Sequence, residues 1–586
     1  MSGLYDYGPI GCAIKTNLIA NWRKHFILHD GIYEIDCPAM TPEVVLQTSG
    51  HVERFADIMV KDMKTGECIR ADHLLEDVME ARTKDGQLTA EQREEAKLIH
   101  ARADDYDKTQ LQELFAKFDI KSPSNNDLSE PEDFNMMFKT EIGPSGALTG
   151  YLRPETAQGI FLAYKRLYEF NNSKLPFAGA QVGVAFRNEI SPRAGLLRVR
   201  EFQMAEIEHF VDPQDKKTKK FASVAHLTVP LMSQANQLNG TPPVKRTLGE
   251  AVADGMIANE TLGYFLGRIF LFLQSIGVDM DRFRFRQHLP NEMAHYACDC
   301  WDSELHTSYG WIECVGCADR SAYDLEAHSK GASIKLEAAI KLKEPVITEV
   351  TEVVPNKKKM GPTFKKDAKV VTTYLAGLSN EEAAAIGTKL AADGKVGITA
   401  EGKDFELTPE TISVATKTVK VHERRFTPSV IEPSFGIGRI MYCLLEHVYD
   451  VRENDAQRGF LRLPSHMAPV KCSLMPLSAQ HEEFQGPIDM LKDQLTKAGV
   501  SCRLDDSSAQ IGRRYARTDE IAIPFGIVID FQTKDDGCAT IRERDTMEQI
   551  RLKLEDIAPL LALLTEGETT WAEAKAEYGV AQTGAK

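Results

Sequence analysis

The chain has 586 residues, of which 43% are hydrophobic and 27% are charged, and this excludes a small module and a disordered tail. It carries 70 Lys and Arg against 86 Asp and Glu, and the net charge of −16 argues against a protein that coats DNA or RNA through bulk charge. A local basic patch on one face is compatible with that total. At roughly 150 residues per domain, the length corresponds to two to four domains.

The cysteines and the first residues indicate a reducing compartment. The 11 cysteines are odd in number and irregularly spaced, which argues against a disulfide framework. No run of about 18 apolar residues occurs, and the chain does not start with a basic stretch followed by an apolar one. We therefore expect a soluble protein with no membrane partner and no visible secretion signal.

Two helices are expected in the first third of the chain. One covers about residues 17–28 and precedes the segment 31–40. The other follows residues 151–155, with Thr156 as its N-cap. Its apolar positions recur at helical spacing and form one face. They are Ile160, Phe161, Tyr164 and Leu167.

The most informative stretch is residues 180–210. Apolar residues alternate from position 182 to position 186, which predicts a strand with Arg187 opposite its apolar face. Pro192 and Gly195 then turn the chain, so the run from Arg198 is expected to return as the second strand of a hairpin. A period of two places Arg198, Arg200, Phe202, Met204 and Glu206 on one face of that strand. Such a mixed face is costly to bury without a ligand.

A similar arrangement is expected at residues 430–448. A short strand places Glu432 and Ser434 on one face and runs through Gly436 and Gly438 into a helix with Arg439 in its first turn. The two glycines alone are weak support, because most such pairs are only turns. Taken singly, each charged residue in these segments is more often part of a structural ion pair than a ligand.

Two insertions and a separate C-terminal unit complete the expected organisation. Charged, helix-prone segments at about residues 76–131 and 329–427 read as insertions. After a boundary near Pro464, the pattern predicts strands at 470–474, 500–504 and 521–530 and a helix at 486–498. This alternation indicates a compact α/β domain.

In combination, these segments resemble the class II aminoacyl-tRNA synthetases. The hairpin with Phe186-Arg187-x-Glu189 resembles motif 2 of that family, Gly436-Ile437-Gly438-Arg439 with its helix resembles motif 3, and Gly31-Ile32-x-x-Ile35-x-x-Pro38-Ala39-Met40 resembles motif 1. Four further stretches resemble the dimeric glycyl-tRNA synthetases of eukaryotic and archaeal type. They are Gly3-Leu4-Tyr5-Asp6-Tyr7-Gly8-Pro9, Thr48-Ser49-Gly50-His51, Leu152-Arg153-Pro154-Glu155-Thr156-Ala157-Gln158-Gly159 and Arg187-Asn188-Glu189-Ile190-Ser191-Pro192-Arg193.

This resemblance covers nearly the whole chain and implies an α+β fold. Residues 1–462 would form a catalytic domain with an antiparallel sheet flanked by helices and interrupted by the two insertions. Residues 463–586 would form an α/β anticodon-binding domain. The resemblance also implies a homodimer in the cytoplasm, with the mitochondrion as a second location. Family members generally have residues before Gly3, so we expect that the N-terminus is truncated or its start misassigned, with any transit peptide lost.

The implied reaction joins glycine and ATP to glycyl-adenylate and then passes glycine to the 3′ end of tRNA(Gly). Charge that develops on the α-phosphate calls for fixed cations and Mg²⁺ rather than a nucleophile. By resemblance, Arg187 holds the α-phosphate, while Arg439 holds the γ-phosphate and sandwiches adenine with Phe202. Glu189 accepts from the adenine amino group, and Glu313 is a candidate Mg²⁺ ligand. The full implied ATP set is Arg187, Asn188, Glu189, Arg198, Val199, Phe202, Glu313, Cys314 and Arg439, and a side activity of the family is diadenosine tetraphosphate synthesis.

The resemblance also assigns the glycine and tRNA contacts. Glu155, Glu206, Glu432, Pro433 and Ser434 match the family's glycine-contacting positions, and steric exclusion can reject every larger amino acid. For tRNA, Arg193 would reach the acceptor end. Arg513, Arg514 and Arg517 in the C-terminal domain would offer guanidinium groups to phosphates and unstacked bases, although a surface salt-bridge cluster is the alternative.

A zinc site is the less favoured interpretation of residues 295–317. Cys314 and Cys317 have the spacing of a zinc half-site, but Cys298-x-Cys300 is a poor second half. We expect no zinc there and place these cysteines in the catalytic sheet as small apolar residues.

Two alternatives to the glycine enzyme stay open from the sequence. One is a class II enzyme for another small amino acid, such as serine, threonine or proline. The other is a synthetase-like accessory factor that keeps the fold without the chemistry. The three pocket carboxylates speak against the first, and the intact arginines Arg187 and Arg439 speak against the second.

Overall fold

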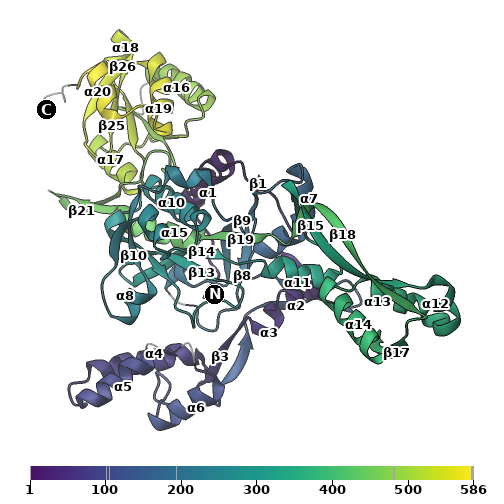
Figure 1. The fold of residues 1–586 in the computed structure, drawn as a ribbon. Helices are drawn as coiled ribbons and strands as arrows, with labels where there is room; N and C mark the ends of the chain where they lie inside the picture. Colours follow the sequence, from purple (N-terminus) through teal and green to yellow (C-terminus); the bar gives the residue numbers. More distant parts are fainter. Residues whose placement is uncertain are drawn as a thin grey trace. The chain divides into compact units, whose positions relative to one another are not determined.

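The structure is a computed structural model that describes residues 2–581 except 101, 104–105, 193, 454 and 479–481. The chain divides into two compact units, one made of Met1–Leu336 with Thr427–Lys586 and the other of Glu337–Phe426 (Figure 1). Among the described residues, no helix combines the length and the hydropathy that crossing a membrane requires.

A nine-stranded sheet is the centre of the first unit. The neighbours β1–β8 and β10–β12 pair in parallel, and the other neighbours are antiparallel. In spatial order the strands are β1 (Tyr33–Glu34), β8 (Phe177–Phe186), β9 (Glu201–Val211), β19 (Ser429–Gly436), β14 (Gly310–Asp319), β13 (Asp299–Thr307), β12 (Phe283–Gln287), β10 (Thr228–Met232) and β11 (Val244–Thr247). The largely antiparallel sheet and the predicted hairpin are therefore confirmed.

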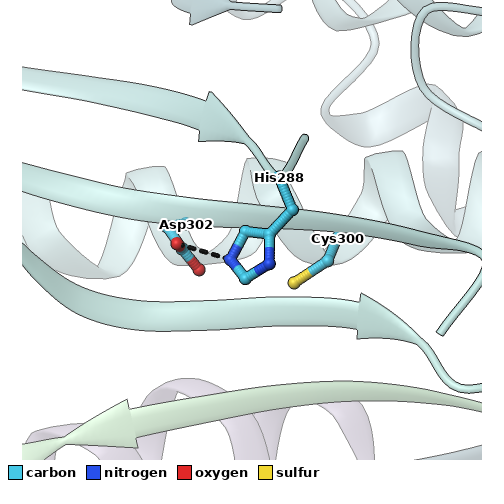
Figure 2. A group of neighbouring side chains, drawn as sticks. All are labelled: His288, Cys300 and Asp302. Atoms are coloured by element: carbon cyan, nitrogen blue, oxygen red, sulfur yellow. Dashed lines mark hydrogen bonds and ion pairs between the residues drawn. The ribbon is translucent and has the colours of Figure 1, made fainter. Parts of the chain in front are cut away.

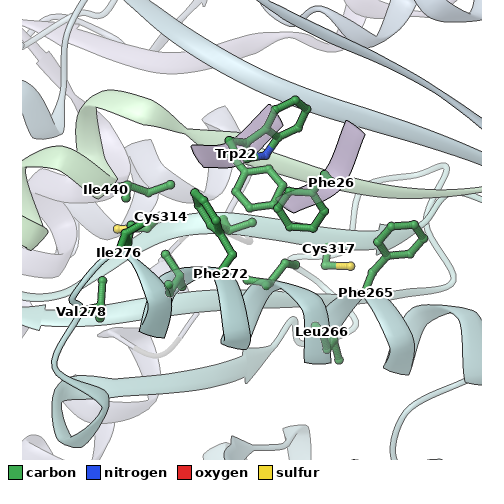
Figure 3. Packing of buried hydrophobic residues seen from close by; sticks show 14 of the residues in the cluster. Trp22, Phe26, Phe265, Leu266, Phe272, Ile276, Val278, Cys314, Cys317 and Ile440 are labelled. Carbon is green, nitrogen blue, oxygen red and sulfur yellow. The ribbon is translucent and has the colours of Figure 1, made fainter. Parts of the chain in front are cut away.

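The two faces of the sheet have different covers. On one face, buried side chains of the sheet pack with the helical segments α1 (Pro9–Trp22), η1 (Arg23–Leu28), α10 (Glu260–Ser275) and α15 (Ile437–Val448) (Figure 3). Trp22 lies 5.5 Å from Phe26 and 5.8 Å from Phe435 between ring centroids. Full burial of one such side chain contributes about 1.5–3 kcal/mol. On the other face, α7 (Ala157–Phe170) and α11 (Tyr323–Ala332) pack on the even-numbered residues of β9 and β19.

Helix α7 matches the sequence prediction. Its four predicted apolar residues are all buried, and they pack against Phe210 and Val430 of the sheet. The covered area ends before Glu206 and Ser434, which lie further along the same strand face. The site predicted from the sequence therefore occupies the part of this face that α7 leaves open to a ligand.

Short elements connect the sheet to the first insertion. They are β2 (Met40–Pro42), α2 (Glu43–Thr48), α3 (His51–Arg54), β6 (Phe138–Ile142), β7 (Leu148–Leu152), η3 (Gly195–Leu197), η4 (Lys219–Ser223), α8 (Gln234–Leu238), α9 (Leu248–Ala253) and η5 (Met280–Arg282). The insertion itself contains β3 (Ala56–Lys61), β4 (Cys68–Arg70), α4 (Ala71–Lys84), α5 (Ala90–His100), α6 (Lys108–Lys117) and β5 (Glu132–Asn135). Its own hydrophobic core starts at Val60 and Ile69, so the folded element begins before the predicted residue 76.

The second unit is a long two-stranded ribbon with helices at its end. β15 (Ala338–Pro355) pairs antiparallel with β18 (Ile412–Phe426), so the unit lies within the predicted second insertion, 329–427. The other elements are α12 (Lys357–Phe364), η6 (Lys365–Asp367), α13 (Ala368–Ala376), α14 (Asn380–Asp393), β16 (Val396–Ala400) and β17 (Lys403–Leu407). The predicted helix from Asn380 is confirmed, and Ser379 caps it together with Glu382.

The C-terminal residues form a five-stranded sheet with helices. After the hairpin β20 (Tyr449–Arg452) and β21 (Asp455–Leu461), the sheet has the order β23 (Cys502–Leu504), β22 (Cys472–Pro476), β24 (Phe525–Ile529), β25 (Cys538–Glu543) and β26 (Gln549–Lys553). The helices are η7 (Glu482–Phe484), α16 (Gln485–Lys497), α17 (Ile511–Glu520), α18 (Thr533–Asp536), α19 (Leu554–Glu566) and α20 (Trp571–Tyr578). Parallel pairing of β22 with β23 and β24 confirms the predicted α/β domain.

Candidate active site

One cleft opens on the sheet face where the two predicted motifs meet. β9 has β8 on one side and β19 on the other, and β19 continues into α15. The cleft lies between these strands and β14 and is lined by charged, polar and apolar side chains from both predicted motifs. Concave sites with a few convergent polar groups are the usual binding sites for small molecules.

Most residues assigned to ATP from the sequence line this cleft. They are Arg187, Glu189, Arg198, Val199, Phe202, Glu313, Cys314 and Arg439. The remaining residue of that set, Asn188, fixes the loop: its backbone N–H donates to the carbonyl oxygen of Met136 at 2.7 Å. Of the face predicted for β9, Arg198, Phe202 and Met204 line the cleft, whereas Arg200 donates to the carbonyl oxygens of Ser2 and Glu189 instead. Ala205 and Ile207 enter the hydrophobic core.

Arg187 is an unpaired cation in this cleft. Its guanidinium lies 5.4 Å from the ring centroid of Phe55 and 5.5 Å from that of Phe202. In the part of the chain that the structure describes, no carboxylate lies within ion-pair distance of Arg187. A guanidinium held between rings keeps its charge available to an anion, and its planar donors suit a phosphate group.

Arg439 is fixed on the opposite wall. Its Nε donates to the carbonyl oxygen of Leu197 at 3.1 Å, and its Nη1 donates to that of Glu313 at 3.0 Å. The Glu313 carboxylate lies 3.5 Å from the same Nη1. The Glu313 side chain is 54% exposed; partial removal from water raises its pKa, but the charges of Arg439 and Arg187 outweigh this effect, so the pKa lies below its usual value. The carboxylate is therefore ionised at neutral pH, which is the form that binds Mg²⁺.

A buried cluster of carboxylates adjoins the cleft and is organised by one arginine. Arg320 is completely buried; its Nη1 donates to Oε2 of Glu432 at 2.8 Å, and its Nε donates to Oδ2 of Asp324 at 2.8 Å. Its Nη2 lies 3.8 Å from Oε1 of Glu155. Arg320 thus links two of the predicted glycine residues. Removing one partner of such a buried ion pair costs about 3–5 kcal/mol.

Glu206 is held by three donors. Its Oε2 accepts from the backbone N–H of Thr156 at 2.6 Å and from the Thr156 hydroxyl, and its Oε1 accepts from the Ser434 hydroxyl at 2.8 Å. Ser434 lines the cleft and joins Glu206 to the open space. Pro433 lies opposite Cys317 in β14. Glu432 and Ser434 flank Pro433 in the strand, so their side chains lie on the same strand face.

Thr156 is the N-cap residue of α7, as predicted, but its side chain makes no capping hydrogen bond. Its φ and ψ are −96° and −12°, whereas a capping residue normally has extended backbone angles. The hydroxyl donates to Glu206 instead, so this residue orients the carboxylate.

The carboxyl groups of the cluster differ in their charge states. Burial raises the pKa of Glu432 to about 8; Arg320 opposes this effect, and the nearby charges of Glu206 and Glu155 add to it. Burial and the charge of Glu432 also raise the pKa of Glu208 well above its usual value. Glu208 is completely buried, and its two carboxyl oxygens have no hydrogen-bond partner among the described residues. Glu208 is therefore neutral.

Sequence reasoning missed Arg320, Asp324, Glu208 and His51. His51, at the start of α3, places its Nε2 3.4 Å from Oε1 of Glu155. It belongs to the stretch Thr48-Ser49-Gly50-His51, which carried part of the family resemblance, and this signal could have found it. Arg320 and Asp324 are four residues apart just after β14 and look like an ordinary helix-start ion pair in the sequence.

The three arginines assigned to tRNA in the C-terminal domain have different surroundings. Arg513 is exposed in α17, and Arg517 is half-exposed and lies 3.1 Å from Asp505. Arg514 contradicts the prediction of an accessible guanidinium: it is 2% exposed and donates to the backbone carbonyls of Pro476, at 2.7 Å, and Asp505. Its place on the inner side of α17 makes it structural. Arg193 lies outside the described residues.

The cysteines of residues 298–317 are distributed over two strands. Cys314 and Cys317 are buried in the hydrophobic core, and Cys300 lies opposite Ala318 in the pairing of β13 with β14. Cys298 is exposed. The potential metal-ligand group that the described residues do form consists of His288, Cys300 and Asp302, and it contains only one of these four cysteines.

Comparison with known proteins supports the assignment of both domains. Residues 143–236 match the model of the tRNA synthetase class II core domain (G, H, P, S and T), and residues 471–562 match that of the anticodon binding domain. The chain is 52% identical over 581 residues to a glycine–tRNA ligase of Drosophila melanogaster, a match that covers 99% of this chain and 76% of the relative.

Two more distant organisms provide similar relatives. A glycine–tRNA ligase of Caenorhabditis elegans is 51% identical over 99% of this chain and 78% of its own length. One of Methanocaldococcus jannaschii is 42% identical over 96% of this chain and 94% of its own length. With identities this high across nearly the whole chain, and with the cleft and its carboxylate cluster in place, this chain belongs to the glycine–tRNA ligases, a family of class II aminoacyl-tRNA synthetases.

Proposed function

We propose that the cleft activates glycine with ATP to form glycyl-adenylate and pyrophosphate, and then transfers glycine to the 3′ end of tRNA(Gly). One observation carries this proposal. Unpaired Arg187 and the anchored Arg439 lie in the same cleft as Ser434, which hydrogen-bonds the buried carboxylate of Glu206. A site for the phosphate groups of ATP thus adjoins a site for the ammonium group of glycine, and the reaction needs both groups side by side.

In the first step, a carboxylate oxygen of glycine attacks the α-phosphorus, and the bond to the bridging oxygen of pyrophosphate breaks. Arg187 offsets the charge on the α-phosphate, and Arg439 binds the γ-phosphate and stacks on adenine opposite Phe202. Both arginines are held by contacts within the protein, so their geometry requires little reorganisation. Glu189 and the backbone around Arg198 and Val199 bind the base.

Glycine binds with its ammonium group toward the carboxylates. Glu155 and Glu206 supply negative charge, Glu432 adds to it in its ionised form, and Ser434 and Pro433 form the wall next to the α-carbon. Glu206 and Glu432 are less than 10% exposed, and this leaves little space for a side chain. Larger amino acids are therefore excluded by contact.

Mg²⁺ would enter this site with ATP, and Glu313 is the residue that would hold it. Its ionised carboxylate beside Arg439 fits an oxygen-preferring cation. When bound, Mg²⁺ supplies further neutralisation of the phosphate charge. Glu313 itself also orients Arg439.

The tRNA would contact the C-terminal domain through Arg513 and Arg517. Arg514 supports this surface from within, because it fixes the backbone of Asp505, the partner of Arg517. Arg193 is proposed to reach the acceptor end. We place the enzyme in the cytoplasm, with mitochondria as a second location. We also propose a homodimer through motif 1 and the helical segment before it, whose last residue, Leu28, is 76% exposed.

The relatives do not favour the two alternatives, since their names specify glycine. Exchange of labelled pyrophosphate into ATP tests the proposal directly. We expect exchange that depends on glycine and is absent with serine, threonine, proline or alanine. No exchange with glycine would contradict the proposed function, and exchange with another amino acid would correct the substrate.

A further inference from the structure

A cluster of three metal-type ligands lies beside the cleft and has no role in the proposed reaction. His288, Cys300 and Asp302 each offer one ligand atom, and these atoms lie within 4.8 Å of one another. Figure 2 shows the His288 ring between the other two side chains, with the Cys300 sulfur beside the ring nitrogen that Asp302 does not contact.

The sheet itself produces this cluster. Cys300 and Asp302 are two residues apart on β13, so their side chains leave the strand on the same face. His288 directly follows the neighbouring strand β12, and its backbone N–H donates to the Cys300 carbonyl oxygen at 2.9 Å. This hydrogen bond fixes His288 next to the other two residues.

The cluster is buried but incompletely paired. Cys300 is 9% exposed and Asp302 is 5% exposed. Nε2 of His288 lies 2.7 Å from Oδ2 of Asp302, while Nδ1 is buried without a hydrogen-bond partner among the described residues. A buried ring nitrogen that lacks a partner next to a thiol is costly unless a further group is bound there.

The surrounding charge favours a cation. The carboxylate of Glu313 acts electrostatically on both Asp302 and Cys300. A divalent cation stabilises a carboxylate and a thiolate together.

The cluster also has an opening toward the cleft. Asp302 lies opposite Gly316 in β14, and Gly316 lies opposite Ser434 in β19, so the three share one sheet face. A Cβ atom at position 316 would lie 3.6 Å from Oδ1 of Asp302. Gly316 has no side chain and lines the cleft, so this residue does not separate Asp302 from the substrate space.

We propose that His288, Cys300 and Asp302 bind a transition-metal ion of the Zn²⁺ type, with its fourth coordination position directed toward the cleft. One nitrogen, one sulfur and one carboxylate ligand suit Zn²⁺ and Co²⁺ and exclude Mg²⁺, which prefers oxygen. Zinc bonds of about 2.0 Å to nitrogen and 2.3 Å to sulfur require the ligand atoms to approach by about 1 Å. Binding therefore replaces the hydrogen bond between His288 and Asp302 with bonds from both residues to the metal. This site neither requires nor supplies the glycine activation proposed above.

Cobalt absorption tests the proposal on the full chain after removal of metals with a chelator. We expect one equivalent of Co²⁺ to bind with a sulfur-to-metal charge-transfer band in the near ultraviolet, and Zn²⁺ to displace it. Cys300→Ser and His288→Gln should abolish the band and weaken binding by about 100-fold or more. Cys298→Ser changes an exposed thiol two residues away and should keep the band.

Three results would overturn the site: no band, a band that survives in Cys300→Ser and His288→Gln, or displacement of Co²⁺ by an equal concentration of Mg²⁺. Far-ultraviolet circular dichroism verifies that each variant is folded, and His288→Gln, at a half-buried position, remains available if Cys300→Ser does not fold. Pyrophosphate exchange is measured separately, so failure of metal binding and failure of glycine activation are distinguishable.

Discussion

Substitution of Glu206 by Gln removes one negative charge from the glycine site while preserving its hydrogen bonds. In the native site, Oε2 accepts two hydrogen bonds from Thr156, and Oε1 accepts one from Ser434. A glutamine can keep its carbonyl oxygen on the Thr156 side. Its NH₂ group can donate to the Ser434 hydroxyl, which rotates to accept. The second N–H of the amide has no acceptor among these groups, so far-ultraviolet circular dichroism is used to verify that the variant folds.

The expected loss is therefore that of one charged hydrogen bond to the glycine ammonium. Such bonds contribute about 1.5–3 kcal/mol. At about 1.4 kcal/mol per factor of ten, the KM for glycine should rise roughly 10- to 150-fold in Glu206→Gln. The KM for ATP should change less than about threefold, because Arg187, Arg439 and Phe202 are untouched.

Glu208→Gln is the matched control. Glu208 lies two residues along the same strand on the same face, is equally buried and is already neutral. Its substitution should leave the KM for glycine within about threefold of the native value. The assay is pyrophosphate exchange, with glycine varied at saturating ATP and then ATP varied at saturating glycine. Equal effects of the two variants, or a rise in the KM for ATP matching that for glycine, would refute the reasoning.

Three further outcomes are expected. Glu432 ionises at a pKa of about 8, and its ionised form binds an ammonium group better, so the KM for glycine should fall as pH rises toward 8. The variant Glu432→Gln should flatten this pH dependence. A KM for glycine that rises with pH would contradict the reasoning. Arg439→Ala should lower kcat for pyrophosphate exchange by about 10²- to 10³-fold, and an unchanged rate would remove Arg439 from the phosphate site. Arg513→Ala should spare exchange and weaken tRNA charging. Arg514→Ala should instead destabilise the C-terminal domain by about 3 kcal/mol in denaturant unfolding, and normal stability would contradict its buried role.

The elements that follow a simple period were predictable from the sequence. The hairpin of β8 and β9, the four apolar residues of α7 and the turn from β19 into α15 all obey the spacing of strands and helices. The same spacing placed Glu206 and Ser434 on one face of neighbouring strands. Periodicity succeeds here because each side chain's direction depends only on its own strand.

Contacts between distant segments were not predictable in this way. Arg320 joins Glu155 and Glu432, which are 277 residues apart by number, and nothing in the local sequence distinguishes it from a surface arginine. Arg514 shows the converse case. Its neighbours Arg513 and Arg517 are exposed, but the helical turn directs Arg514 inward to free carbonyl groups. Burial of a charged residue depends on acceptors supplied by other elements, and a sequence pattern does not contain them.

The ribbon that carries the second unit begins and ends at one place. Ala338, the first residue of β15, is paired with Phe426, the last residue of β18, so the two ends of this 90-residue excursion lie about 5 Å apart. A tight turn could therefore replace the whole excursion. The strands that precede and follow the excursion in the sequence, β14 and β19, would not be disturbed, because they pair directly with each other. The active-site strands are thus independent of the excursion's length, and this position can gain, lose or exchange a domain during evolution while the chemistry of the cleft is retained.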